Sequence, residues 1–391
     1  MSSFLACQNN NQQPQEPGYT LTGTLKGIDT GSVKLMVFND EITHAQKIID
    51  SGAIKDHQFK LQGKIGVPRL MYLLITPGNW KFPVFVEDTT LSITADTAGS
   101  EYFDQTAYGG PKGADIDSVT ETGSKNYDDW VRFQKDPGQK QYYAVSEDLY
   151  KQFKEQAAKG DKDAEYKVRD KMDSVRKLLQ AWQKKKINEY ISEHPGSVAG
   201  IYMFYQLYLS SQDFPTRDLD STLQKFQGAA AASVYYRPMA DDLAKKKAVL
   251  PGSIAPDFTL LKRDSSKFTL SGLRGKVHMI DFWASWCHPC RQAIPHWKKV
   301  YAKYHDKGFE MVSVSDDFKW PDWFKAMDQE KMPWTQVCDD FNVKNMPARV
   351  GSLYMTTYIP FYVLLDKEGK ILVYSGKEED IDNKLKELFG S

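Results

Sequence analysis

The sequence predicts a multidomain chain with an all-β N-terminal part, either a small sandwich or an open barrel, a central α-helical region and a C-terminal α/β domain. Three observations predict this order. Short segments in which apolar and polar residues alternate come first, apolar residues at helical spacing follow, and predicted strands then alternate with predicted helices. At 391 residues the chain also exceeds one ordinary domain. We place the boundaries at residues 1–18 for a tether, 19–105 for the β domain, 106–250 for the helical region and 251–391 for the α/β domain.

The strands of the β domain are predicted from their period of two. In YTLTGTLKG, Leu21, Gly23 and Leu25 alternate with threonines, as in a strand with one buried face. Turn-forming Gly, Asp, Asn and Pro residues separate further stretches of this kind, which are SVKLMVFN, HQFKLQG, RLMYLLITP, KFPVFVED and TTLSITAD. No catalytic motif stands among them, so we interpret this part as a packing or docking module.

The helical region is predicted to begin near residue 127, after a loop rich in Gly, Asp and Ser. Its clearest signal is an apolar stripe with steps of four and three residues, formed by Val168, Met172, Val175, Leu179 and Trp182. We interpret the stripe as packing on neighbouring helices, with a coiled-coil partner seam as the alternative. Further helices are predicted at Val198–Ser210, Ser221–Ala232 and Arg237–Lys247, with Ser197 as the N-cap of the first.

The α/β domain follows a linker marked by Pro251, Gly252 and Pro256. KVHMIDFWA is almost continuously apolar, which indicates a strand buried on both faces. A helix is predicted from about residue 289 to 305, followed by the strand FEMVSVS. A helix, two strands and a final helix complete the domain, at residues 321–331, 362–366, 371–374 and 379–389.

The charge balance and the apolar runs argue against a nucleic acid partner and against a membrane-spanning helix. Lys+Arg and Asp+Glu balance at 51 each, so the chain has no positive excess to neutralise phosphates, and we expect no nucleic acid partner. No run approaches eighteen apolar residues, so we expect no membrane-spanning helix. Apolar content of 41% is ample for packed cores.

One of the 4 cysteines stands near the N-terminus. Cys7 follows a short apolar stretch and precedes the polar, proline-containing QNNNQQPQEPG, which is typical of a flexible tether. This resembles the end of a bacterial lipoprotein signal, although the basic and long apolar regions of a complete signal are missing. We expect Cys7 to be the lipidation site of a truncated signal; the alternative is an accidental resemblance, with an incidental cysteine in an unstructured terminus.

The chemistry centres on Cys287-His288-Pro289-Cys290, where the predicted buried strand ends and a helix begins. A thiolate at a helix N-terminus is stabilised by unpaired N–H groups and the helix dipole, so the pKa of Cys287 should fall below its usual value. Cys290, one turn into the helix, can then resolve a mixed disulfide. Pro289 suits the first helical turn because it lacks an N–H. The positive charge of His288 should make the disulfide more oxidising.

FWASWCHPC is preceded by APDFTL and followed by YIPFYVLLDKEGKI, all within about residues 251–391. On these motifs, this part of the chain resembles the thioredoxin superfamily, specifically the TlpA/ResA-like thiol-disulfide oxidoreductases, an AhpC/TSA-type module. The resemblance implies a C-terminal thioredoxin fold. The two upstream regions resemble, more weakly, the β domain and helical linker that precede such modules in envelope proteins of some Gram-negative anaerobes.

The resemblance also implies further site residues. Ile359-Pro360 corresponds to the cis-proline loop that faces the dithiol, where substrate backbone docks. Asp281, six residues before Cys287, corresponds to a buried acid that exchanges a proton with the resolving thiol. Trp286 is expected to shape the docking surface. The Glu of many TlpA-type proteins is replaced here by Ala293.

Other interpretations of the cysteines fit less well. A zinc site needs about four ligands, and the haem-attachment motif needs His where Arg291 stands. Peroxiredoxins carry Pro-x-x-x-Thr-x-x-Cys, whose Thr and Pro positions are Ala284 and Ile280 here. Cys338 is predicted to end a short strand as a small buried hydrophobe, with a redox role as the alternative.

The expected function is thiol-disulfide exchange with protein disulfides or dithiols, without metal or organic cofactor, because the sulfurs of Cys287 and Cys290 carry the electrons. By resemblance, we expect a periplasm-facing, lipid-anchored protein of the bacterial cell envelope that receives electrons from a membrane or periplasmic donor. The membrane contact would be through Cys7 alone. The alternatives are an envelope adaptor whose β and helical parts bind a partner and a peroxiredoxin-like peroxidase. Direction of transfer, substrate and oligomeric state are left open.

Overall fold

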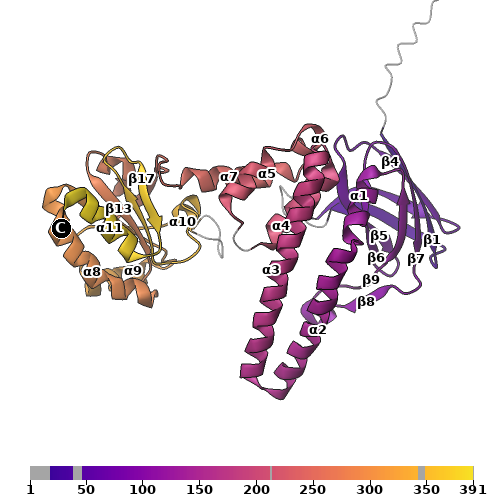
Figure 1. The fold of residues 1–391 in the computed structure, drawn as a ribbon, viewed down its shortest axis with the longest axis horizontal. Helices are drawn as coiled ribbons and strands as arrows, with labels where there is room; N and C mark the ends of the chain where they lie inside the picture. The colour runs from indigo at the N-terminus through magenta and orange to yellow at the C-terminus, as the bar shows by residue number, and fades with distance from the viewer. Residues whose placement is uncertain (1–17, 38–45, 212–213, 342–347, 391) are drawn as a thin grey trace, which may run out of the picture. The chain divides into compact units, whose positions relative to one another are not determined.

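The computed structural model describes residues 18–37, 46–211, 214–341 and 348–390. It divides into two compact units, Met1–Ala240 and Asp241–Ser391. In Figure 1 the first unit runs from indigo to magenta and the second from orange to yellow. None of the helices in the described ranges has the length and apolar character needed to cross a membrane.

The described strands of the first unit form two sheets around one core. The 4-stranded sheet has the order β10-β7-β1-β4, formed by β10 (Ser118–Thr122), β7 (Thr90–Asp96), β1 (Tyr19–Lys26) and β4 (Gln58–Gly63). The 6-stranded sheet has the order β3-β2-β5-β6-β9-β8, formed by β3 (Lys47–Ile54), β2 (Gly31–Val37), β5 (Arg69–Thr76), β6 (Trp80–Val86), β9 (Lys112–Asp115) and β8 (Glu101–Asp104). Leu21 and Leu91 from one sheet and Leu73 from the other lie in the same hydrophobic cluster. The alternation predicted for β1 is confirmed, since Leu21 and Leu25 are buried.

The strands continue beyond the boundary that the sequence predicts at residue 105. β9 and β10 lie in the stretch expected to be a loop before the helices. These short strands, KGAD and SVTET, are too polar to show an alternating pattern. They form because β10 pairs with β7 and β9 pairs with β6 and β8, so tertiary pairing decides their structure.

The helices of the first unit follow these strands. They are α1 (Lys125–Gln134), α2 (Pro137–Lys159), α3 (Lys162–Glu193), α4 (Val198–Ser210), α5 (Thr216–Leu223) and α6 (Gly228–Ala231), and α7 (Tyr236–Ala248) crosses the division between the units. A short 3₁₀ helix, η1 (Thr106–Tyr108), precedes them. The predicted cap of α4 is confirmed, because the Ser197 hydroxyl accepts from the Gly200 N–H at 3.1 Å. The helix predicted at Ser221–Ala232 is wrong, since α5 ends at Leu223 and the φ of 51° at Gly228 is left-handed.

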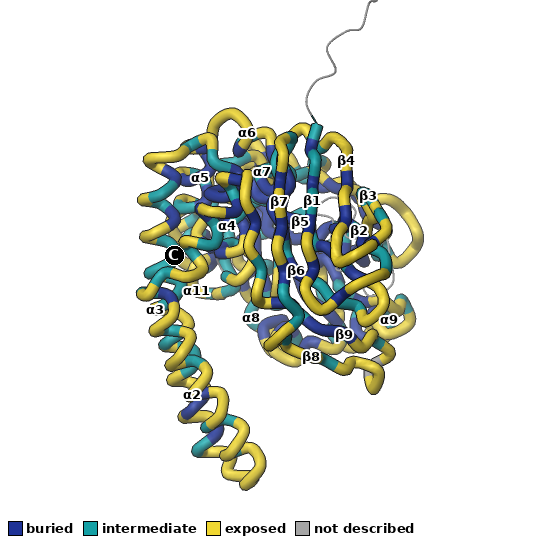
Figure 2. Tube along the Cα trace, turned by 90° about the vertical axis from the view of Figure 1, so that its right-hand side faces the viewer, coloured by how far each residue is buried: buried dark blue, intermediate teal, exposed yellow. Residues whose placement is uncertain are grey.

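The long helices α2 and α3 form a hairpin whose far end is largely exposed (Figure 2). On α3, the five residues of the predicted apolar stripe are buried or half-buried within the unit. Trp182 stacks on Phe133 of α1 at 6.0 Å, and Gln183 donates to Gln139 of α2 at 2.9 Å. The stripe therefore packs on neighbouring helices, as interpreted from the sequence.

The described part of the second unit is built on a 7-stranded sheet of order β12-β11-β15-β14-β13-β16-β17. Its strands are β12 (Lys267–Thr269), β11 (Thr259–Leu261), β15 (Thr335–Cys338), β14 (Phe309–Ser315), β13 (Val277–Trp283), β16 (Phe361–Leu365) and β17 (Ile371–Ser375). Its helices are α8 (His288–Tyr304), α9 (Trp320–Glu330), α10 (Arg349–Leu353) and α11 (Glu378–Phe389), with 3₁₀ turns η2 (Leu270–Leu273) and η3 (His305–Lys307). The element types predicted for this domain are confirmed, with bounds within one or two residues.

The side chains of the central strand β13 are buried on both faces of the sheet. All of its residues are buried, as the apolar run predicts. Ile280 and Phe282 join one hydrophobic cluster, which includes Val350 of α10. Met279 joins another, with residues of α8 and α11. Successive side chains of β13 thus enter different cores, which fixes the register of the strand and the point where α8 begins.

Candidate active site

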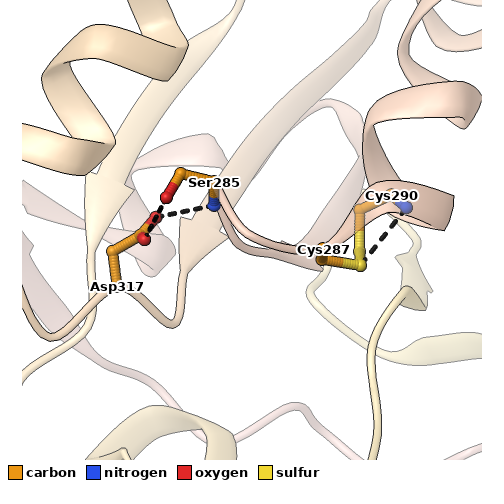
Figure 3. Close-up of a disulfide and its surroundings, with 4 residues drawn as sticks. All are labelled: Ser285, Cys287, Cys290 and Asp317. Atoms are coloured by element: carbon orange, nitrogen blue, oxygen red, sulfur yellow. Dashed lines mark hydrogen bonds between the residues drawn. A yellow bond between two sulfur atoms is a disulfide. The ribbon is translucent and has the colours of Figure 1, made fainter.

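The two sulfurs lie at the start of α8, directly after the turn that leaves β13. Cys287 is the N-cap of the helix, and its Sγ accepts from the Cys290 N–H at 3.2 Å. The two cysteines form a disulfide with their Cα atoms 5.3 Å apart (Figure 3). Pro289 lies in the first helical turn, where its missing N–H costs nothing. The strand-to-helix placement predicted from the sequence is confirmed.

Exposed side chains surround this disulfide. Cys287 is 5% exposed and Cys290 3% exposed, whereas the Trp286 side chain is 64% exposed. His288 and Pro289 are also exposed. Because orphan N–H groups of the first helical turn favour an anion, a Cys287 thiolate is stabilised there once the disulfide opens. A reactive sulfur can thus form next to an exposed aromatic ring, that of Trp286.

The loop before β16 lies beside the dithiol. The Ile359–Pro360 peptide bond is cis, as the resemblance implies. Ile359 packs against the hydrophobic cluster that contains Cys287 and Cys290. Phe361, which follows Pro360, pairs with Phe282 of β13. The sheet therefore brings the sequence-predicted Ile359-Pro360 loop and the dithiol to the same end of β13.

Asp281 is buried in the middle of the sheet. It is 4% exposed, and its neighbours in register are Ser313 of β14 and Tyr362 of β16. The Ser313 hydroxyl donates to Asp281 Oδ2 at 2.7 Å, and Trp334 Nε1 donates to Ser313 Oγ at 2.8 Å. Burial raises the pKa of Asp281 to about 7, while the hydrogen bond from Ser313 opposes this rise. The carboxyl can therefore gain or lose a proton near neutral pH.

A carboxylate that the sequence reasoning missed fixes the turn before Cys287. Asp317 accepts from the Ser285 N–H at 2.9 Å and from its hydroxyl at 2.5 Å (Figure 3). The Ser315 hydroxyl donates to the same carboxylate at 2.5 Å. The available signal was the pair of acids directly after FEMVSVS, since ends of parallel neighbouring strands meet at one edge of a sheet. Asp317 thus holds the turn that carries Trp286 and Cys287.

Of the two remaining cysteines, Cys338 lies in the same hydrophobic cluster as Cys287 and Cys290, and Cys7 is not described. Cys338 ends β15 as predicted and is buried; burial and nearby acids raise the pKa of its thiol to about 12, so it stays protonated. The predicted lipidation site Cys7 lies outside the described residues. Within the described ranges, no group of three or more His, Cys, Asp or Glu side chains is arranged to hold a metal ion.

Comparison with known proteins gives matches to both units. Residues 250–389 match the family model Redoxin, and residues 19–130 match a domain of unknown function (DUF4369). The thiol-disulfide oxidoreductase ResA of Bacillus thuringiensis (strain Al Hakam) is 25% identical over 170 residues, which span 41% of this chain and 89% of the relative. ResA of Oceanobacillus iheyensis is 41% identical over 93 residues, 23% of this chain and 47% of the relative. The solved thioredoxin domain of a thiol-disulfide oxidoreductase from Bacteroides vulgatus is 32% identical, with a TM-score of 0.33, and the match covers 36% of this chain and 97% of that chain.

The fold and the site define the class of the second unit. A disulfide that caps the helix after a buried central strand, with a cis-proline loop beside it, is the arrangement of a thiol-disulfide oxidoreductase. Together with the Redoxin match and the ResA relatives, it places the C-terminal unit in the thioredoxin superfamily, as a TlpA/ResA-like member. The family resemblance and the oxidoreductase activity predicted from the sequence are confirmed.

Proposed function

We propose that this enzyme exchanges two electrons with protein disulfides or dithiols in the bacterial cell envelope, using Cys287 and Cys290. In the reducing direction, the Cys287 thiolate attacks one sulfur of a substrate disulfide, which forms a mixed disulfide and releases one substrate thiolate. The Cys290 thiolate then attacks Cys287 Sγ, closes the Cys287–Cys290 bond and releases the second substrate thiolate. The observation that carries this proposal is the disulfide at the N-cap of α8.

Asp281 is proposed to accept the proton of Cys290 before the second attack and to return it in the reverse direction. Its pKa of about 7 supports this role, because a proton acceptor works best when its pKa lies near the working pH. Trp286, Pro289, Ile359 and Pro360 are proposed to form the docking surface, and His288 to tune the potential. The sulfurs carry the electrons themselves, so the proposed reaction needs no metal or organic cofactor.

The cellular setting is part of the proposal. We propose a periplasm-facing protein anchored by a lipid on Cys7 and served by a membrane or periplasmic electron donor; the sequence around Cys7 supports the anchor. The two sheets with a shared core support a small β-sandwich for the first unit. The intact mass of the protein from its native host tests the anchor: an unmodified Cys7 rules it out.

The test of the activity is reduction of insulin disulfides by the full-length chain. Cys287→Ser should abolish turnover, Cys290→Ser should trap a mixed disulfide with the substrate, and the matched control Cys338→Ser should remain active. Equal inactivity of wild type and Cys287→Ser, with a partner still bound by both, would favour the adaptor alternative. The potential then gives the direction: about −270 mV indicates a reductant and about −120 mV an oxidant.

A further inference from the structure

A cavity of about 690 Å³ lies beside the dithiol in the second unit. Trp286 from the turn before α8 and Ile359 from the cis-proline loop line it on the side of the site. Phe282 and Met355 add apolar walls, and Asp316, directly after β14, adds a carboxylate. The cavity is thus continuous with the surface proposed for docking.

Asp316 is an acid at this end of the sheet whose carboxylate contacts no partner in the part of the chain that the structure describes. Its backbone N–H is held by the Trp283 carbonyl at 2.8 Å, but within the described residues its side chain has no hydrogen bond or ion pair. Asp317 is used by Ser285, and Asp339 accepts from the backbone of α10. Asp316 is therefore available to a ligand.

The electrostatic surroundings of Asp316 favour a cation. Burial and the negative charges of Asp339 and Asp317 raise the pKa of Asp316 to about 6, and an incoming positive charge would relieve this repulsion. Asp242, a third acid on the lining, pairs with Lys246 at 3.3 Å. Lys245, the cation that lines the cavity, is exposed and forms no ion pair among the described residues.

The apolar walls of the cavity match the aliphatic stem of a basic side chain. Lys and Arg place an apolar stem along apolar surface and a charged head against a carboxylate. Phe282, Trp286 and Met355 offer that apolar surface, and Asp316 offers the carboxylate. A neutral apolar side chain would fill the same walls but leave the half-buried Asp316 carboxylate without a partner, which is unfavourable.

We propose that this cavity receives a lysine or arginine side chain of the protein substrate, close in sequence to its reacting cysteine, and that Asp316 determines this specificity. The inference rests on the proposed function and names its substrate class: disulfide proteins with a basic residue beside the target cysteine. The covalent step is unchanged, and the cavity acts only by selecting which substrate sulfur reaches Cys287.

The test uses the full-length chain with Cys7→Ser and Cys290→Ser, so that Cys287 is a free thiol and cannot close the internal disulfide. Synthetic peptides carry one cysteine as a mixed disulfide with 5-thio-2-nitrobenzoate, and one lysine at each of three positions on either side. Attack by Cys287 forms the peptide mixed disulfide and releases the coloured thiolate. At one position at least, lysine should react about tenfold faster than its uncharged isostere norleucine, and salt should reduce this ratio.

The variants give the decisive comparison. Asp316→Asn should bring the lysine-to-norleucine ratio close to one, Asp316→Lys should reverse the preference towards glutamate peptides, and the control Asp306→Asn should keep the ratio. A ratio near one in the parent protein, or an unchanged ratio in folded Asp316→Asn, overturns the inference while leaving the proposed function intact. If Cys287 reacts with no peptide at all, the proposed function fails, and the inference fails with it.

Discussion

Replacement of Asp281 by Asn tests the buried carboxyl directly. The amide has the same shape and its oxygen can still accept from Ser313, which donates to Asp281 Oδ2 at 2.7 Å in the native protein. The variant therefore removes the ionisation of this group while keeping the sheet and the hydrogen bond. We expect the variant to be more stable than the wild type at pH 8 and to have lost most of its rate of disulfide exchange.

The size of the stability difference between Asp281→Asn and the wild type follows from the pKa of Asp281. Burial raises the pKa of Asp281 from 3.8 to about 7 in the folded state, so the folded protein holds this proton more tightly than the unfolded chain. The contribution of Asp281 to stability is therefore fully present below pH 4 and is lost as the pH rises from 4 to 7. At about 1.36 kcal/mol for each pH unit, the fall amounts to about 4 kcal/mol. An amide N–H left without a partner costs about 1 kcal/mol, so the net gain of Asp281→Asn above pH 7 is about 3 kcal/mol.

Scanning calorimetry of the oxidised full-length protein between pH 4 and pH 8 provides the measurement. The transition of the second unit is recognised because reduction of Cys287–Cys290 displaces it. The stability gained in Asp281→Asn should grow with pH and should turn into a small loss near pH 4, where only the cost of the unpaired amide N–H remains. Asp306→Asn, which changes an exposed carboxyl, should show no such trend. A gain that is the same at pH 4 and pH 8, or a variant less stable at pH 8, would refute the reasoning.

Three further predictions follow from single contacts. Ser313→Ala removes the hydrogen bond that opposes the rise in the pKa of Asp281, so this pKa should increase further; carboxyl titration by infrared spectroscopy measures it, and an unchanged value contradicts the role of Ser313. His288→Gly removes the imidazole between the two cysteines, whose cationic form would stabilise a thiolate, and should lower the reduction potential measured against glutathione; an equal or higher potential contradicts this. Ser197→Ala removes the cap of α4 and should cost about 1 kcal/mol in the first unit alone, as seen in the calorimetric transition that Cys287–Cys290 reduction does not displace.

The second unit was predictable because its signals are local and strong. The apolar run of β13 and the helix pattern of α8 fix the two elements, and Cys287 and Cys290 lie at their junction. Element bounds follow from the same periodicity, as in β14, which spans Phe309–Ser315 as predicted. The cis bond before Pro360 came from the family resemblance, since composition and periodicity carry no information on it.

The first unit was less predictable because pairing between distant segments decides part of it. β9 and β10 carry polar sequences that become strands only beside β6, β8 and β7. The helix predicted across Gly228 fails for a local reason, because that residue takes a left-handed conformation. Strands with an alternating pattern are predictable from the sequence, whereas β9 and β10 form through pairing with strands distant in sequence.

The acids of the second unit show why the roles of site residues follow from their contacts in the structure, even where the motif is clear from the sequence. Asp281 lies within the apolar run of β13, and Asp316 and Asp317 directly follow β14, so their neighbours in sequence do not reveal their different roles. Their positions in the structure separate them. Asp281 accepts from Ser313, Asp317 holds the Ser285 turn, and Asp316 lines the same cavity as Trp286 and has no side-chain partner among the described residues. One acid can therefore move a proton, one can fix the nucleophile's turn and one can select a substrate, because each carboxylate has different partners and not because its residue type differs.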